Sequence, residues 1–346
     1  MIRRFRPDGG ATPAAIVDGA KAVRRPSRHR LMQIGFTLLA VAALLYVVDW
    51  QSFLATLASA SLSLLGLGLV LLVIDRLLMS WKWGLLLDAQ GFHLPLWENW
   101  GIYSLVTFAG MLLPATIGGD LIRTGWLWRR GLPASAGAAS IILERVVGSA
   151  VALAFAGAGL IFLAGHATAA LDLTPLLAVT LASFGGVLLA LLLSFRVPPG
   201  WLPDRLVGSR LGSFLGRLHA AYTGYRTRPG LILVFAALTV AEYLLIILTT
   251  FVIARALGIE VGAVYFGAAL AVALVIARLP IAIDGIGVFE GALVLLLAWA
   301  DVAPAATVAL AITARFLLLL SCMPPALLLL CLTPLRLRDL SRPLER

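Results

Sequence analysis

Long apolar runs separated by short polar segments dominate the hydrophobic pattern of the chain. Six of them predict membrane-spanning helices, at about 31–48, 62–87, 134–165, 174–195, 231–254 and 305–333. Each run has about eighteen or more nearly uncharged residues, enough for a helix to cross the hydrocarbon layer. The runs lack strand-length alternation, and an open sheet leaves its backbone groups unsatisfied in lipid. The pattern therefore predicts an all-α membrane protein with about six full transmembrane helices.

Two further apolar runs, at about 100–130 and 263–300, are interrupted near their middle. The first break reads LPATIGGDLIR at 113–123 and the second LPIAIDGIGVFEG at 279–291, and both contain Leu-Pro-x-x-Ile-x-Gly. Proline and glycine interrupt helices. Irregular backbone is tolerated at membrane depth only where it is buried in protein or lines a water-filled cavity. We expect two re-entrant hairpins, each made of a broken helix.

Basic residues are confined to some of the gaps between runs, and this predicts the topology. Lys and Arg are abundant in 1–30, 196–230 and 334–346, and they are absent from 49–61, 166–173 and 300–304. Because cytoplasmic segments carry the excess of Lys and Arg, both termini are expected in the cytoplasm. This assignment holds together only if the first hairpin opens from the cytoplasm and the second from the outside.

The order span, span, broken hairpin, span occurs twice, which predicts an inverted repeat. Repeat 1 covers about 31–165 and repeat 2 about 174–333, together forming one transmembrane domain at 31–333. Residues 1–30 are expected to be a disordered basic cytoplasmic tail and 334–346 a second basic tail. The loop at about 196–230 has apolar residues at helical spacing. It is interpreted either as an amphipathic helix on the cytoplasmic leaflet or as a packed cap.

The amino-acid composition excludes several classes of protein. A 61% hydrophobic and 13% charged chain with a mean hydropathy of +1.00 is not a soluble domain. The net charge of +10 lies in the gaps between runs, so it indicates contact with anionic lipid rather than nucleic acid. The four histidines are scattered and no Walker A motif is present. We therefore expect no enzyme activity, no cofactor and no ATP-driven step.

The first break carries a candidate site for a polar headgroup. Gly118 and Gly119 are expected to form a tight turn, Asp120 to cap the helix that begins there, and Arg123 to lie one turn further on the same face. A helix N-terminus next to a guanidinium binds phosphate well. The alternative is an ion pair between Asp120 and Arg123 that only fixes the turn.

The second break repeats this composition, with Pro280, Asp284, Gly285, Gly287 and Glu290 following Arg278. Its glycines resemble a nucleotide loop only weakly, and no strand precedes them. Arg315 lies about ten residues into the last span, where buried charge needs a partner, and Glu290 or Asp284 is the expected one.

Other charges in the runs allow two interpretations. Glu144 and Arg145 either anchor their span at the membrane interface or line the cavity. Lys82 lies among tryptophans that are interpreted as an aromatic belt: Trp81, Trp83, Trp97, Trp100, Trp126 and Trp128. Further membrane-embedded charges are Asp75, Arg76 and Glu242.

Three motifs, LPATIGGDLIR, ILERVVG within 141–148 and LPIAIDGIGVFEG, give the chain a family resemblance over about residues 31–333. It resembles the lysylphosphatidylglycerol synthase transmembrane-region family, the flippase-like domain of the multiple peptide resistance factor. Standalone members include hopanoid biosynthesis-associated membrane proteins. The resemblance implies a bacterial inner-membrane protein that translocates or handles lipids. The family's motif positions fall on Gly118, Gly119, Asp120, Arg123, Glu144, Arg145, Pro280, Gly285, Gly287 and Glu290.

The chain departs from the family pattern at Phe289 and Asp284, which leaves the lipid headgroup open. The aminoacyl-transferase domain of bifunctional relatives is missing, so lipid aminoacylation is not expected. Our leading hypothesis is a flippase for lipids with anionic or modified headgroups. Gly118, Gly119, Asp120 and Arg123 would form its cytoplasmic half-site, and Asp284, Gly285, Gly287, Glu290 and Arg315 its outer half-site. The alternative is a non-transporting assembly factor that recruits lipid-synthesis enzymes. A membrane lipid transferase is disfavoured because no nucleophile or metal set is visible.

Overall fold

A computed structural model describes residues 49–112, 116–165, 173–196, 209–279, 281–282 and 285–333, with residues 35, 39 and 46. Within these ranges every regular element is a helix. The elements are α3 (Trp50–Ala58), α4 (Leu62–Ala89), α5 (Leu96–Leu112), α6 (Thr116–Arg129), α7 (Ala134–Ala164), α8 (Thr174–Ser194), α9 (Arg210–Thr223), the 3₁₀ turn η1 (Gly224–Thr227), α10 (Pro229–Ala256), α11 (Ala263–Ile276), α12 (Val288–Ala298) and α13 (Pro304–Leu332).

Five of the described helices are long and apolar enough to cross a membrane: α4, α7, α8, α10 and α13. They coincide with five of the six spans predicted from the sequence, and their ends agree to within two residues. The predicted span at 31–48 lies almost entirely outside the described residues. The chain is therefore an all-α membrane protein, as the hydrophobic pattern indicates.

Both interrupted runs are divided into two short helices. The first gives α5 and α6, of 17 and 14 residues, and the second gives α11 and α12, of 14 and 11 residues. At 1.5 Å per residue these helices are about 17–26 Å long, shorter than the roughly 30 Å hydrocarbon layer. Pro114, Pro280 and Asp284 lie outside the described residues.

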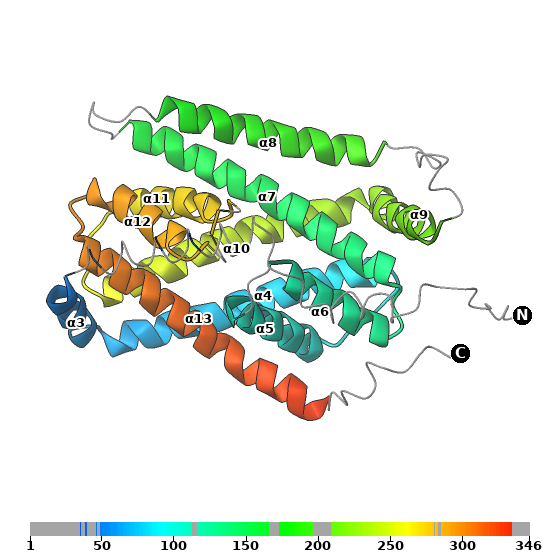
Figure 1. The fold of residues 1–346 in the computed structure, drawn as a ribbon, viewed down its shortest axis with the longest axis horizontal. Coiled ribbons are helices and arrows are strands. Elements are labelled where there is room, and N and C mark those ends of the chain that lie inside the picture. The colour runs from blue at the N-terminus through cyan, green and yellow to red at the C-terminus, as the bar shows by residue number, and fades with distance from the viewer. Residues whose placement is uncertain are drawn as a thin grey trace, which may run out of the picture.

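The two halves of the chain pack by the same plan. Helix α4 packs on its equivalent in the second half, α10. The first hairpin helix of each half packs on the last spanning helix of the other half, which gives the pairs α5 with α13 and α11 with α7. The first residues of α4 and α10 are 167 positions apart, as are those of α5 and α11, and α7 and α13 begin 170 positions apart. The hairpin of α5 and α6 lies toward the end of the molecule where α9 lies, and that of α11 and α12 lies toward the other end (Figure 1). This is the arrangement expected of an inverted repeat; the membrane side of each end stays a prediction.

Individual contacts obey the same spacing. A Cβ added to Gly101 of α5 would lie 2.7 Å from Leu329 Cβ of α13, and one added to Gly159 of α7 would lie 2.7 Å from the Ala268 carbonyl oxygen of α11. Gly101 and Ala268 are 167 positions apart, and Gly159 and Leu329 are 170 apart. The two close contacts are therefore at equivalent positions, and each has one glycine. The glycine lies on the hairpin helix α5 in one contact and on the spanning helix α7 in the other.

The closing bond of each hairpin is also duplicated. Trp126 of α6 donates to Glu98 Oε1 of α5 at 2.7 Å, and Tyr265 of α11 donates to the Leu296 carbonyl of α12 at 2.9 Å. Glu98 and Tyr265 are both third residues of their helices. The chemistry differs between the halves, but the positions that hold each hairpin closed are equivalent.

The approach of α7 to α11 gives a testable result. Gly159→Ala forces a methyl group against the rigid Ala268 carbonyl oxygen, so the two helices must separate. We expect a loss of about 1–3 kcal/mol in stability, measured by unfolding of the purified protein in detergent. Gly148→Ala on the same helix is the control, because nothing lies within 4 Å of the added Cβ. It should be neutral or stabilise the helix by up to about 1 kcal/mol, and equal losses in both variants would contradict the packing.

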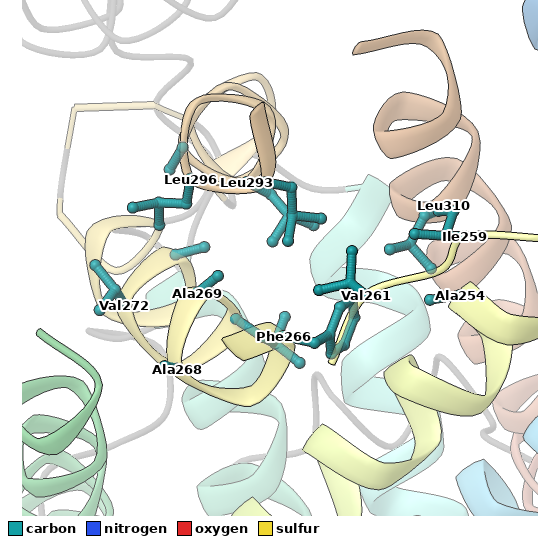
Figure 2. Packing of buried hydrophobic residues seen from close by; sticks show 14 of the residues in the cluster. Ala254, Ile259, Val261, Phe266, Ala268, Ala269, Val272, Leu293, Leu296 and Leu310 are labelled. Carbon is teal, nitrogen blue, oxygen red and sulfur yellow. The ribbon is translucent and has the colours of Figure 1, made fainter. Parts of the chain in front are cut away.

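The largest apolar core lies among α7, α10, α11, α12 and α13. Leu293 and Leu296 of α12 gather with Phe266, Ala269 and Val272 of α11 (Figure 2). Leu293 and Ala269 are fully buried. This packing fixes the second hairpin against the spanning helices, so the charged residues at its break are held by a rigid apolar scaffold.

Helix α9 and η1 pack as a cap on the spanning helices. Tyr222 and Tyr225 join an apolar cluster with Leu86 and Phe235. Tyr225 donates to the Leu86 carbonyl oxygen at 3.0 Å, and burial raises the pKa of this phenol to about 12. Of the two interpretations of the 196–230 loop, these contacts support the packed cap for its described part.

Candidate functional site

Arg123 of α6 occupies a buried aromatic cage. Its guanidinium carbon lies 4.2 Å from the ring centre of Trp83 and 4.4 Å from that of Tyr103. Its Nη2 donates to Glu144 Oε2 at 2.5 Å and to the Tyr103 hydroxyl at 2.9 Å. Tyr103 in turn donates to Glu144. The charge is thus enclosed by its counter-ion and two ring faces, the favourable environment for a desolvated guanidinium.

Asp120 and Arg145 form a second ion pair beside the cage, and this pair is open. Arg145 Nε and Nη2 donate to Asp120 Oδ2 at 2.8 and 2.5 Å. The Arg145 side chain is 55% exposed. It is the twelfth residue of the 31-residue α7, about 17 Å along this spanning helix from its start. An exposed arginine at this position needs a polar environment, because hydrocarbon cannot solvate it.

The first break therefore differs from three sequence-based expectations. Gly118, Gly119 and Asp120 lie inside α6, which already includes Thr116, so Asp120 is not an N-cap and the glycines form no tight turn. Gly119 is needed for packing, because an added Cβ would lie 2.5 Å from Val106 Cγ1 of α5. The expected alternative pair of Asp120 with Arg123 does not form either. Both side chains instead bond to residues of α7.

Glu144 and Arg145 both pair with charged residues of α6. They are the partners of Arg123 and Asp120, so the LPATIGGDLIR and ILERVVG motifs form two crossed ion pairs between α6 and α7. Neighbouring residues on one helix point in different directions, which lets one pair be enclosed and the other exposed.

The second break contains the turn that the glycines predict. Gly285 and Gly287 have φ angles of +66° and +82°, which favour glycine. Gly287 is the N-cap of α12, and its N–H donates to Glu290 Oε2 at 2.7 Å. The other carboxylate oxygen of Glu290 accepts from Arg315 at 3.0 Å. The predicted pairing of Arg315 with Glu290 is confirmed, and Glu290 also stabilises the helix start.

The Asp120–Arg145 pair of the first half occupies the same position in the repeat as the Glu290–Arg315 pair of the second half. Asp120 and Arg145 are 25 residues apart, and so are Glu290 and Arg315. Arg145 and Arg315 are each the twelfth residue of their spanning helix. The shared letters of the two breaks do not reveal this correspondence, which depends on the helix register.

A buried charge cluster joins α4 to α10. Lys82 of α4 pairs with Glu242 of α10 and donates to Thr239 Oγ1 at 3.2 Å. Asp75 and Arg76 pair within α4 at 2.5 Å, and all four charged residues are buried. Asp75 and Glu242 are each the fourteenth residue of their 28-residue helices. The cluster thus lies at the contact between the two halves.

The aromatic-belt interpretation is wrong for part of its set. Trp83 is fully buried, Lys82 is 2% exposed and Trp126 is 9% exposed. Trp81, Trp97 and Trp128 do have exposed side chains. Lys82 follows Asp75 by two helical turns, a spacing that places both residues on one face of α4. This spacing in the sequence indicates a shared charged face.

Glu98 was not identified from the sequence as a site residue. It is buried at the start of α5, and it accepts from Trp126 and, at 2.8 Å, from Arg130. Arg278, which precedes the second break, donates to the Tyr243 hydroxyl of α10 and lies over that ring. Among the described residues, no group of three or more His, Cys, Asp and Glu side chains is placed to hold a metal ion.

These features define an integral helical membrane protein with charged pairs within its helices, beside two broken hairpins. The chain belongs to the lysylphosphatidylglycerol synthase TM region family, which it matches over residues 31–326. The resemblance stated from the three motifs is confirmed, and it connects the protein with lipid-related processes. A comparison with curated proteins finds no match.

Proposed function

We propose that the protein is a flippase that binds a lipid by its polar headgroup between the two hairpins and moves it across the bacterial inner membrane. The observation that carries the proposal is Arg145, an arginine with a 55% exposed side chain at the twelfth position of the 31-residue spanning helix α7. Such a group needs water or an anionic partner at that position. A lipid phosphate supplies both charge neutralisation and acceptor oxygens.

The surroundings of the two ion pairs suit a lipid. Large apolar side chains are exposed along the outer helices, among them Val179, Leu189 and Leu192 of α8, so the acyl chains can stay in the bilayer. The headgroup alone then needs a polar route, and Arg145 and Arg315 offer it one accessible positive charge in each half. Membrane lipids with anionic or modified headgroups are the expected substrates.

The test is lipid translocation in liposomes that contain the purified full-length protein. Fluorescent anionic, aminoacylated and hopanoid-type lipids are each supplied, and the rate at which the label becomes inaccessible to an outside quencher is measured. At least one class should move faster with protein than without. Arg145→Gln should abolish most of this acceleration, while Arg217→Gln, at an exposed arginine of α9, should leave it unchanged.

Two results would reject the flippase. The first is no acceleration for any lipid class. The second is acceleration that Arg145→Gln leaves intact. Co-purification of a lipid-synthesis enzyme together with absent translocation would favour the assembly-factor alternative, in which the charged pairs only hold the fold.

A further inference from the structure

We infer that the Asp120–Arg145 and Glu290–Arg315 ion pairs are equivalent half-sites for one anionic group, in which Asp120 and Glu290 occupy the place that the lipid phosphate takes when it binds. In this scheme, which rests on the proposed function, each carboxylate holds its arginine while no lipid is present. The phosphate then displaces the carboxylate from Arg145 in one half and from Arg315 in the other.

Equivalence is the first support. Each pair joins the second helix of a hairpin to the twelfth residue of the following span, over the same 25-residue separation. The surrounding contacts follow the same register, from the glycine approaches at Gly101 and Gly159 to the closing bonds of the hairpins. The arrangement is therefore a duplicated feature of the fold and not a chance encounter of two charges.

Exposure of the two arginines is the second support. The Arg145 and Arg315 side chains are 55% and 27% exposed, whereas those of Lys82 and Arg76 are 3% and 10% exposed. The Asp120–Arg145 pair is accessible on both sides, and such a pair contributes only about 0–1 kcal/mol, so an incoming anion replaces Asp120 at little cost. The Glu290 side chain is 8% exposed, so in the second half the arginine is the accessible partner. A buried pair resists, because breaking it leaves an uncompensated charge.

Chemical similarity selects the ligand. A guanidinium binds carboxylate and phosphate oxygens with the same forked geometry, so a carboxylate is a natural competitor of phosphate. The two hairpins, which carry the two carboxylates, lie toward opposite ends of the molecule (Figure 1). The ligand class is a lipid whose headgroup contains a phosphate monoanion, with phosphatidylglycerol as the simplest probe.

The two half-sites differ in one respect. Glu290 keeps a second bond to the Gly287 N–H at the start of α12, whereas the Asp120 side chain is 26% exposed. Displacing Glu290 from Arg315 therefore leaves its carboxylate still engaged, ready to return. Glutamine at this position retains an oxygen that can accept from Gly287, which makes Glu290→Gln a suitable test variant.

The experiment measures phosphatidylglycerol binding to the purified full-length protein in neutral-lipid nanodiscs. Asp120→Asn and Glu290→Gln remove the competitor. Lipid affinity should rise by about two- to fivefold in Asp120→Asn, the factor that an exposed ion pair gives, and it should also rise in Glu290→Gln. Arg145→Gln and Arg315→Gln should lower it. Asp88→Asn, which changes an exposed acid of α4, is the matched control and should have no effect. Thermal unfolding of each variant is measured alongside.

The outcomes are separable. Weaker lipid binding in Asp120→Asn and Glu290→Gln together with lower thermal stability would show that the pairs are structural and would overturn the inference, even if the protein translocates lipid. The expected binding pattern without any translocation would support the half-sites and reject the flippase. Inorganic phosphate serves as a separate probe: equal competition by free phosphate would overturn the assignment to a lipid headgroup.

Discussion

Glu242→Gln should lower the free energy of unfolding by about 3–5 kcal/mol, the largest single loss that we expect in the chain. The side chains of Glu242 and Lys82 are 9% and 3% exposed, and Lys82 also lies over the Phe235 ring. Glutamine has nearly the shape of glutamate but no charge, so it leaves the Lys82 ammonium buried without a counter-ion. Unfolding of the purified protein by increasing denaturant in detergent measures the loss.

Two further variants show that charge imbalance is the cause. The double variant Lys82→Met with Glu242→Leu removes both charges and should recover most of the stability, because apolar side chains can replace a buried pair at little cost. Asp88→Asn breaks an exposed pair with His93 and should cost less than about 1 kcal/mol. A double variant as unstable as Glu242→Gln would contradict this explanation.

Arg123→Ala is the second large effect, with an expected loss of about 3–5 kcal/mol. The substitution removes the guanidinium from between Trp83 and Tyr103 and leaves Glu144 in a buried position with only the Tyr103 hydroxyl bound to it. Arg123→Lys should give an intermediate loss. Lysine keeps the charge, but it lacks the planar group that stacks on both rings and the forked donors.

Arg145→Ala tests whether the loss of stability is specific to Arg123 or follows from removing any arginine of these two motifs. Arg145 belongs to the neighbouring pair, but its side chain is mostly exposed, so stability should fall by less than about 1 kcal/mol. Translocation should nevertheless be lost, as for Arg145→Gln. If Arg145→Ala destabilises the protein as much as Arg123→Ala does, then the division into an enclosed pair and an open pair is wrong.

The spanning helices were predictable from the sequence because lipid imposes a simple rule. A helix that crosses hydrocarbon needs a long uncharged run, and the ends of α4, α7, α8, α10 and α13 follow those runs to within two residues. The breaks between α5 and α6 and between α11 and α12 were equally visible. The pairing of Arg315 with Glu290 followed from the cost of isolated charge at depth.

The crossed pairs at the first break were not predictable from local sequence. Two adjacent glycines are typical of a turn, but here Gly118 and Gly119 lie within a helix, and the need for glycine at 119 comes from the close approach of Val106 on α5. Spacing along one helix favoured Asp120 with Arg123, whereas tertiary contact with α7 supplies better partners. The repeat register was hidden for a similar reason: Glu98 and Tyr265 are equivalent in position, but their side chains differ.

Sided cysteine labelling tests the central claim most directly. Arg145→Cys and Arg315→Cys are introduced separately into a chain in which Cys322 and Cys331 are replaced by alanine, and each is treated with a membrane-impermeant thiol reagent from one side of the membrane at a time. We expect the cysteine at 145 to react only from the cytoplasm and the one at 315 only from the outside. Reaction of both from the same side, or of neither from either side, would contradict two inverted half-sites that admit a polar headgroup.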